Sequence, residues 1–238
     1  MKLINPTIIL VRPQLSENIG MTARAMDNFG LSKLFIVNPR DEWPSKLAEN
    51  SAKQGINIIK KVKIFTSLQD AVSKFKVVIA TTNRKRFITK QIFNNFYDLN
   101  KKISDFKNTA ILFGPENSGL SNQDLRLANY IYTIKTASIN KSLNLSHAVS
   151  LISYELFNSK KMTNILEENN QKVTKLDLLN FLNSLINDLD SMNFFKPIEK
   201  KESMIDNIFA IYNKMNLTKK ELRMLWGMHK KLKNQPKL

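Results

Sequence analysis

The sequence predicts an α/β fold, a mostly parallel sheet with helices on both faces, followed by a small all-α extension. Over residues 1–160, short and nearly continuous apolar runs alternate with segments of helical periodicity. Strands that are apolar throughout are typical of a parallel sheet that is buried on both faces. Beyond about residue 160 the strand signal disappears and only helical patterns remain. We therefore expect one domain at residues 1–160 and a helical extension at residues 161–238.

The expected strands are apolar runs that end at a proline or at polar turn residues. The first run stops at Pro13 and the second stops at Pro39. The run from Val77 to Ala80 is apolar at every position, which predicts a buried strand. Strands are predicted at 7–12, 33–38, 62–65, 77–80, 109–113 and 130–134.

The expected helices are delimited by capping residues and glycines. Gly30 and Gly55 each follow a helical pattern, as C-terminal glycines do. Three pairs have the capping-box spacing, in which a Ser or Thr is followed three residues later by an acidic residue. These pairs are Ser121 with Asp124, Thr174 with Asp177, and Thr218 with Glu221. Helices are predicted at 18–29, 45–54, 68–75, 146–157 and 201–215, and after each of the three capping pairs, with a polar linker at 158–175.

The composition favours a phosphate-binding protein. The 238 residues include 37 Lys and Arg against 20 Asp and Glu, a formal net charge of +17. Such a charge steers a protein toward nucleic acid, although lysine richness can also come from a compositional bias. The absence of cysteine excludes disulfides, thiolate nucleophiles and iron–sulfur clusters, and with two histidines no metal site is expected. Without a long apolar stretch or a signal peptide, we expect a soluble, cytoplasmic protein with no membrane contact.

The arginines are few, so each is a candidate for a role that lysine cannot fill. Arg84, Lys85 and Arg86 form the densest basic cluster, and Phe87 follows them. Such a cluster suits contacts with RNA phosphates and bases, and a solvated charged loop is the alternative. The remaining arginines are Arg12, Arg24, Arg40, Arg126 and Arg223.

Three segments stand out as candidate ligand-binding loops, at residues 18–24, 113–120 and 141–149. The first two directly follow predicted strands, where α/β proteins place ligand contacts, and the third opens a helix. None contains a phosphate-binding loop, a dinucleotide fingerprint or a nucleophile elbow. Glu116 could be an acid, a base or, as we favour, a carboxylate that holds its loop. Arg24 could equally form a surface pair within its helix, and His147 is expected to be a packing or surface residue.

Together, the three segments resemble the signature of the SpoU (TrmH-like) branch of the SPOUT methyltransferases. The blocks are Asn-Ile-Gly-Met-Thr-Ala-Arg, Phe-Gly-Pro-Glu-Asn-Ser-Gly-Leu and Ser-Leu-Asn-Leu-Ser-His-Ala, in the family's order. The resemblance implies an S-adenosylmethionine-dependent RNA 2′-O-methyltransferase with a C-terminal trefoil knot in its α/β domain. Within the branch, the sequence is most similar to bacterial tRNA enzymes with a helical extension. That similarity implies methylation of cytidine or uridine at nucleotide 32 of the anticodon loop.

The resemblance also implies which residues act. The cofactor would be held by Thr81, Thr82, Asn83, Gly114, Ile134, Ser142, Leu143 and Asn144. Catalysis would involve Arg24, with Asn18, Glu116, Ser142 and Asn144 arranging the site. Because a guanidinium stays protonated, we expect Arg24 to bind a phosphate and stabilise the developing alkoxide rather than accept a proton.

The family further implies a homodimer that donates Arg24 across its interface and binds tRNA, with no other protein partner. Val149, Ile152 and Leu156 suit either this interface or an intrachain core.

The aromatic residues of the extension are Phe194, Phe195, Tyr212 and Trp226. They are expected to form a small core rather than to stack on bases. Removing the extension is expected to weaken tRNA methylation and to leave cofactor binding intact. The alternatives are 2′-O-methylation of another tRNA or rRNA site, a non-catalytic RNA-binding protein with the same fold, and a factor that binds RNA by charge alone.

Overall fold

A parallel sheet forms the centre of the molecule. The structure, a computed structural model, describes residues 5–84, 90–103, 105–137, 142–159 and 172–233. Within these residues, seven strands form one sheet in the order β3-β2-β1-β6-β4-β7-β5, and every neighbouring pair is parallel. The predicted α/β class is therefore confirmed. The strands are β1 (Thr7–Val11), β2 (Leu34–Val37), β3 (Lys63–Phe65), β4 (Val77–Thr81), β5 (Gln91–Phe93), β6 (Thr109–Phe113) and β7 (Tyr130–Tyr132).

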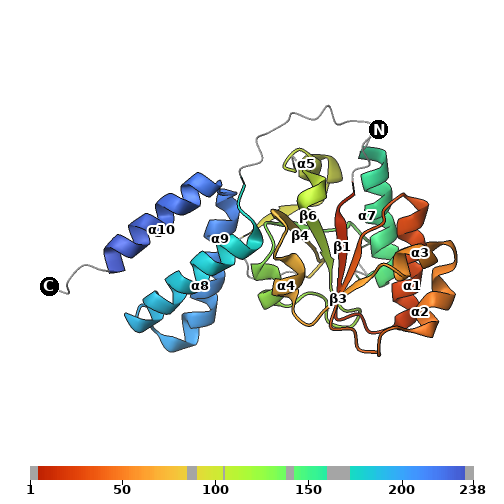
Figure 1. The fold of residues 1–238 in the computed structure, drawn as a ribbon, viewed down its shortest axis with the longest axis horizontal. Helices are drawn as coiled ribbons and strands as arrows, with labels where there is room; N and C mark the ends of the chain where they lie inside the picture. Colours follow the sequence, from red (N-terminus) through yellow and green to blue (C-terminus); the bar gives the residue numbers. More distant parts are fainter. Residues whose placement is uncertain (1–4, 85–89, 104, 138–141, 160–171, 234–238) are drawn as a thin grey trace.

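Helices cover both faces of this sheet (Figure 1). Side chains alternate along β1, so that Ile8 and Leu10 enter one hydrophobic core while Ile9 and Val11 enter the other. The first core is closed by α1 (Ser16–Asn28), α2 (Lys46–Ala52), α3 (Ile56–Ile59), α5 (Phe96–Asn100) and α7 (Leu145–Ser159). The second is closed by α4 (Leu68–Val72) and α6 (Asn122–Arg126).

The predicted capping pairs form as the sequence indicated. The Ser121 hydroxyl accepts a hydrogen bond from the Asp124 backbone N–H, and the Asp124 carboxylate accepts one from the Ser121 backbone N–H. These reciprocal bonds satisfy amide groups that a helix start leaves unpaired. The same reciprocal arrangement is made by Thr174 with Asp177 and by Thr218 with Glu221.

The structure differs from the expected elements around Gly55. This glycine does not end the helical segment, because a 3-10 turn at Lys53–Gly55 leads directly into α3. A Cβ atom on Gly55 would lie 2.6 Å from the Arg24 backbone nitrogen, and one on Gly20 would lie 2.2 Å from the Ala48 carbonyl oxygen. Only glycine lets α1 approach its neighbours this closely.

Strand β5 and helix α5 also have no counterpart in the sequence prediction. Strand β5 has three residues, and Gln91 and Ile92 are both exposed, so no apolar run marks it. Helix α5 spans only five residues, a length at which helical periodicity is not visible.

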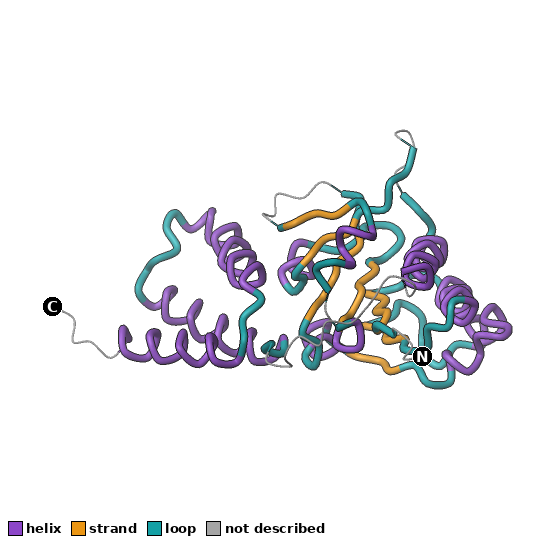
Figure 2. The backbone as a smooth tube through the Cα atoms, turned by 90° about the horizontal axis from the view of Figure 1, so that it is seen from above, coloured by secondary structure: helices purple, strands orange, loops and turns teal. Residues whose placement is uncertain are grey.

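The C-terminal helices lie beside the sheet (Figure 2) and form a third hydrophobic cluster. Phe195 is buried in this cluster, and Tyr212 and Trp226 pack against it, as predicted. Phe194 is 51% exposed, so its expected core position is wrong. The cluster lies against the α/β region through contacts of α8 with α4 and of α9 with α6. Its helices are α8 (Lys175–Ser191), α9 (Lys201–Met215) and α10 (Lys219–Lys233), with a 3-10 turn at Ile198–Lys200.

The apolar face of α7 belongs to the chain's own core. Val149, Ile152 and Leu156 are each at most 1% exposed, which selects the intrachain alternative for these residues. The exposed apolar side chains of α7 are different ones, Leu151, Tyr154 and Phe157.

The connection that would form the trefoil knot runs between β7 and α7. Residues 138–141 of this connection lie outside the described residues, and the knot stays a prediction. In the part of the chain that is described, no helix combines the length and apolarity needed to cross a membrane.

Candidate active site

A cavity of about 970 Å³ opens at the carboxyl ends of β4, β6 and β7. At this edge of a parallel sheet, loops that are distant in sequence meet. Leu145 and Ala148 of α7 also line the cavity, so the third motif segment reaches it as well. The lining contains Thr81, Thr82, Asn83, Gly114, Ile134, Ser142 and Leu143, all predicted as cofactor residues.

Hydroxyl groups tie the strand ends that form the walls. Thr81 Oγ1 donates to the Leu112 carbonyl oxygen at 2.7 Å, which joins β4 to β6. Thr133 Oγ1 donates to the Thr82 carbonyl oxygen at 2.8 Å, and the Thr82 N–H donates to the Tyr132 carbonyl oxygen at 3.1 Å. These threonines therefore hold the backbone of the cavity walls in place.

The loop after β6 is closed on itself. The Gly119 N–H donates to the Pro115 carbonyl oxygen at 2.8 Å. A Cβ atom on Gly114 would lie 2.3 Å from the Leu120 nitrogen, so this turn requires glycine. Arg84, which also lines the cavity, donates from Nη2 to the Asn117 carbonyl oxygen at 2.8 Å and joins the β4 loop to this one.

A chain of side-chain hydrogen bonds joins the three motif segments. Glu116 accepts from Asn18 Nδ2 at 2.7 Å and from the Gln14 backbone N–H at 2.9 Å, so both carboxylate oxygens are engaged. Asn18 Oδ1 in turn accepts from Asn144 Nδ2 at 3.0 Å. Asn144 Oδ1 accepts from the Ser146 backbone N–H at 2.9 Å, and this bond caps the start of α7. Glu116 thus holds its loop against α1, the interpretation that the sequence favoured.

A second connection, between the residue that follows β1 and the segment that follows the β6 loop, was not predicted. Arg12 follows β1 with a left-handed φ of 50°, and its guanidinium binds both carboxylate oxygens of Asp124. Asp124 also accepts from the Ser121 N–H and hydroxyl, at 2.7 and 2.8 Å. Arg12 therefore holds the end of this loop that leads into α6, whereas Glu116 holds the part of the loop that follows β6. The one sequence signal was the presence of a rare arginine directly after a strand.

The catalytic candidate Arg24 lies apart from this network. It is exposed on α1, six residues beyond Asn18, which corresponds to about 9 Å along the helix. Its side chain is not part of the cavity lining within the described residues. Ser142 is exposed at the rim of the cavity, and His147 is a surface residue. Lys85 and Arg86 lie outside the described residues.

The chemistry of the cavity fits a nucleoside cofactor with a polar tail. Phe113, Ile131, Ile134 and Leu143 provide apolar walls for a flat base, while polar side chains gather where the strands end. Burial, and secondarily the negative charge of Glu155, raise the pKa of Tyr132 in this wall, so its phenol stays neutral at physiological pH.

Comparisons with known proteins agree with this geometry. The model of the SpoU rRNA methylase family matches residues 5–154. An uncharacterized tRNA/rRNA methyltransferase of Haemophilus influenzae is 31% identical over 230 residues, with 94% of this chain and 92% of that protein covered. The tRNA (cytidine-2′-O-)-methyltransferase TrmJ of Methanocaldococcus jannaschii is 32% identical, with 82% and 86% covered. The crystal structure of TrmJ from Z. mobilis ZM4 superposes with a TM-score of 0.87 at 34% identity, over 96% of this chain and 99% of that one.

The family match covers more than half of the chain and includes all three motif segments that meet at the cavity. The chain therefore belongs to the SpoU rRNA methylase family and is an S-adenosylmethionine-dependent methyltransferase.

Proposed function

We propose that this enzyme methylates the ribose 2′-OH of tRNA in the cytoplasm, at cytidine or uridine 32 of the anticodon loop. The observation that carries the proposal is the Asn144–Asn18–Glu116 chain of hydrogen bonds, which joins three segments distant in the sequence beside one cavity. The M. jannaschii relative, a tRNA (cytidine-2′-O-)-methyltransferase, supports tRNA as the substrate class. The choice of nucleotide 32 rests on the resemblance of the sequence to bacterial tRNA enzymes with a helical extension.

The cavity is proposed to hold S-adenosylmethionine. Ile134, Leu143 and the backbone at Gly114 would contact the adenosine, and Thr82, Asn83 and Ser142 would face the polar parts of the cofactor. When bound, the cofactor supplies a methyl group already activated by a sulfonium. The protein must then align the ribose oxygen, exclude water and stabilise the charge that develops on that oxygen.

Arg24 is proposed to act on the substrate bound to the partner subunit. Its exposed position, outside the cavity of its own chain, supports donation across a homodimer interface. Exposed apolar side chains of α1 and α7, which pack side by side, support an interface there: Met21 is 40%, Leu151 44% and Tyr154 50% exposed. The guanidinium would bind the phosphate next to the target ribose and stabilise the alkoxide as it forms.

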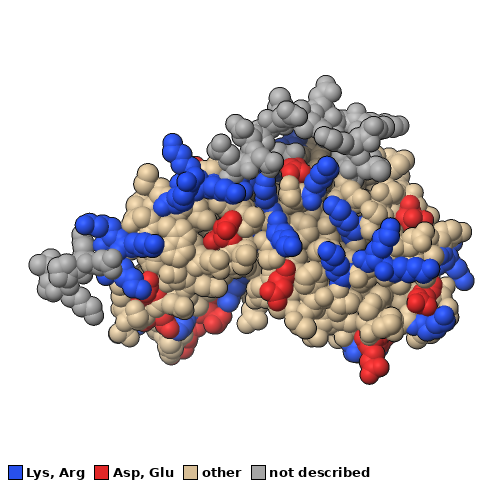
Figure 3. All heavy atoms as spheres, viewed as in Figure 1, with Lys and Arg blue, Asp and Glu red and all other residues tan. Residues whose placement is uncertain are grey.

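Basic side chains support RNA as the partner. Lys and Arg residues are spread over both the α/β region and the helical extension on the face shown in Figure 3, where they outnumber acidic ones. Helix α10 exposes a basic stripe that includes Lys219, Arg223 and Lys230. Arg84, which lines the cavity, would meet the RNA backbone close to the reacting ribose.

The test is to incubate the purified protein with unmodified tRNA transcripts and labelled S-adenosylmethionine and to locate the methylated ribose. The proposal expects one 2′-O-methylated nucleotide at position 32, and loss of labelling when that nucleotide carries a 2′-deoxyribose. A product at another tRNA position or in rRNA would support 2′-O-methylation as the reaction but contradict nucleotide 32 as its target. Binding of RNA without saturable cofactor binding in calorimetry would instead identify a non-catalytic protein.

A further inference from the structure

A buried lysine joins the two strands that form one wall of the cavity. Lys90 is 8% exposed, and its ammonium donates to the carbonyl oxygens of Arg126, at 3.1 Å, and Ala128. Lys90 immediately precedes β5, and the segment from Arg126 to Ala128 leads into β7. Both strands reach the cavity, because their middle residues, Ile92 and Ile131, belong to its lining.

Strand β5 depends on contacts of this kind together with the burial of Phe93, because it is short. It has three residues and lies at the edge of the sheet, where β7 is its one neighbour in the described structure. Short edge strands contribute few ladder hydrogen bonds, so their position depends on side-chain contacts. A displaced Lys90 would therefore displace Ile92 and this wall of the cavity.

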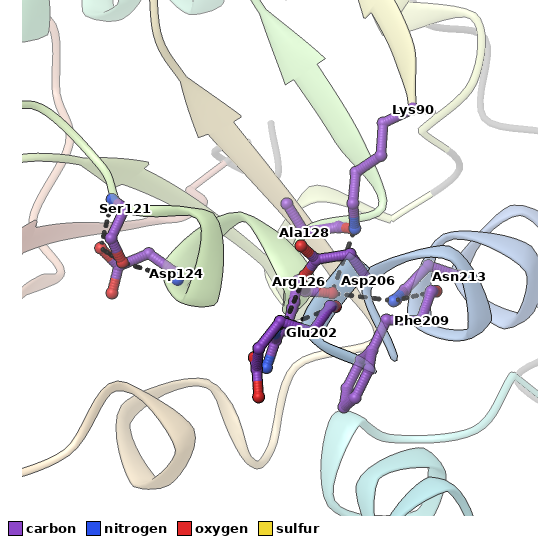
Figure 4. A network of polar contacts seen from close by, with 9 residues as sticks. All are labelled: Lys90, Ser121, Asp124, Arg126, Ala128, Glu202, Asp206, Phe209 and Asn213. Atoms are coloured by element: carbon purple, nitrogen blue, oxygen red, sulfur yellow. Dashed lines mark hydrogen bonds and ion pairs between the residues drawn. The ribbon is translucent and has the colours of Figure 1, made fainter. Parts of the chain in front are cut away.

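Helix α9 of the extension lies beside this tie (Figure 4). Asn213 of α9 donates from Nδ2 to the same Arg126 carbonyl oxygen that Lys90 binds, at 3.0 Å. The Arg126 guanidinium forms ion pairs with Asp206 and Glu202, and Arg126 and Asp206 are 16% and 14% exposed in their side chains. Because α9 shields this cluster from water, the hydrogen bonds of Lys90 are stronger than they would be at a free surface.

Further contacts bind the start of β7 to the end of α9. Asn216 donates from Nδ2 to the Tyr130 hydroxyl at 2.9 Å. The side chain of Asn129 accepts from the Val78 N–H at 2.9 Å and donates to the Asn213 carbonyl oxygen at 3.3 Å. The strands behind the cavity wall and the extension are thus parts of one polar network.

We propose that Asp206 and Asn213 are positioning residues for the cofactor cavity, acting through Arg126 and Lys90 on strands β5 and β7. This inference rests on the proposed use of the cavity as the S-adenosylmethionine site. It gives the extension a role in cofactor binding, whereas the sequence suggested that cofactor binding would be independent of it.

The test compares two aspartates of the extension that each form an ion pair. Asp206→Ala removes the pair with Arg126, and the control Asp190→Ala removes the exposed pair with Lys201. The S-adenosylmethionine Kd is measured by calorimetry on the full chain, together with kcat and KM for both substrates. We expect Asp206→Ala to weaken cofactor binding about tenfold, with kcat at saturating cofactor nearly unchanged, and the control to bind like the wild type. Equal cofactor Kd values for Asp206→Ala and the wild type would overturn the inference.

Coupling between variants separates positioning from a general loss of stability. If Asp206 acts through Arg126, the double variant Asp206→Ala/Arg126→Met binds the cofactor no more weakly than Arg126→Met alone. Additive losses would contradict that route. Urea unfolding is followed for every variant, and if Asp206→Ala is not folded, Arg126→Lys carries the same test because lysine cannot bind both carboxylates as arginine does. A wild-type protein that fails to bind S-adenosylmethionine would refute the proposed function itself.

Discussion

Asn18 donates a hydrogen bond to Glu116 at 2.7 Å, although 98 positions separate the two residues in the sequence. Glu116 acts only as an acceptor here, with one oxygen for Asn18 and the other for the Gln14 N–H. We expect Glu116→Gln to place an amide NH₂ against one of these donors, and to lower stability by about 1–3 kcal/mol and kcat by at least about tenfold. Urea unfolding and single-turnover methylation measure the two effects. Unchanged turnover would mean that the loop keeps its position without the carboxylate.

Asn144 has two functions that different substitutions separate. Its oxygen caps α7, and its nitrogen donates to Asn18. Asn144→Asp keeps an acceptor at the cap but removes the donor to Asn18, so we expect reduced turnover with the cap of α7 retained. Asn144→Ala removes both and should also lower the free energy of unfolding by about 1 kcal/mol. Equal turnover in Asn144→Asp and wild type would show that the bond to Asn18 is dispensable.

Arg24→Ala is expected to abolish turnover and to leave cofactor binding intact, because Arg24 lies outside the cavity of its own chain. Arg24→Lys should recover little, since an ammonium cannot form the two-pronged contact of a guanidinium with phosphate. Full activity in Arg24→Lys would show that a point charge suffices. Mixed dimers of Arg24→Ala with Leu143→Arg, a variant blocked at the cavity, should regain activity if Arg24 acts across the interface. Mixtures that stay inactive would indicate that Arg24 acts on the substrate bound to its own subunit.

Arg12 and Asp124 form a partly buried ion pair whose loss should lower the free energy of unfolding. Arg12→Met leaves the Asp124 carboxylate, 6% exposed, without its cation. We expect a loss of about 2 kcal/mol in the free energy of unfolding, measured by urea denaturation. The double variant Arg12→Met/Asp124→Asn should recover part of it, because no unpaired buried charge remains. A double variant that loses the sum of the two single effects would argue against a direct pair.

Stability should rise with pH above neutrality because of Lys90. Burial lowers the pKa of Lys90 to about 7, despite the opposing attraction of Asp206, and Lys214 lowers it further. The pKa of Lys175 is also lowered, by burial and by the charge of Lys90. In the unfolded chain a lysine pKa is about 10.4, so the unfolded state binds more protons between these values and stability increases with pH there. Unfolding in urea at a series of pH values from 7 to 10 tests this, and Lys90→Met should flatten the rise. An equal slope in that variant would assign the effect to other groups.

Local chemistry made much of the fold predictable from the sequence. Each capping pair, such as Ser121 with Asp124, joins residues three positions apart, and β6 is marked by a continuous apolar run. The three motif segments were also found, because resemblance to a family identifies residues that geometry then brings together. The edge strand β5 was missed because it is short and half exposed.

The polar ties between distant segments were not predictable. Arg12 and Asp124 are 112 positions apart, and Arg126 and Asp206 are 80 apart. The sequence around these residues does not indicate their partners, because the pairing depends on which loops the sheet order places side by side. The amide pair of Asn18 and Asn144, 126 positions apart, is of the same kind.

The close packing at Gly20 and Gly55 has a consequence for both halves of the reaction. These glycines leave no space for α1 to slide or roll against its neighbours. Asn18, which is hydrogen-bonded to Glu116, and Arg24, which is exposed, are therefore carried on one fixed helix. If both residues act as proposed, helix geometry sets the spacing between them, and neither can shift without moving the other.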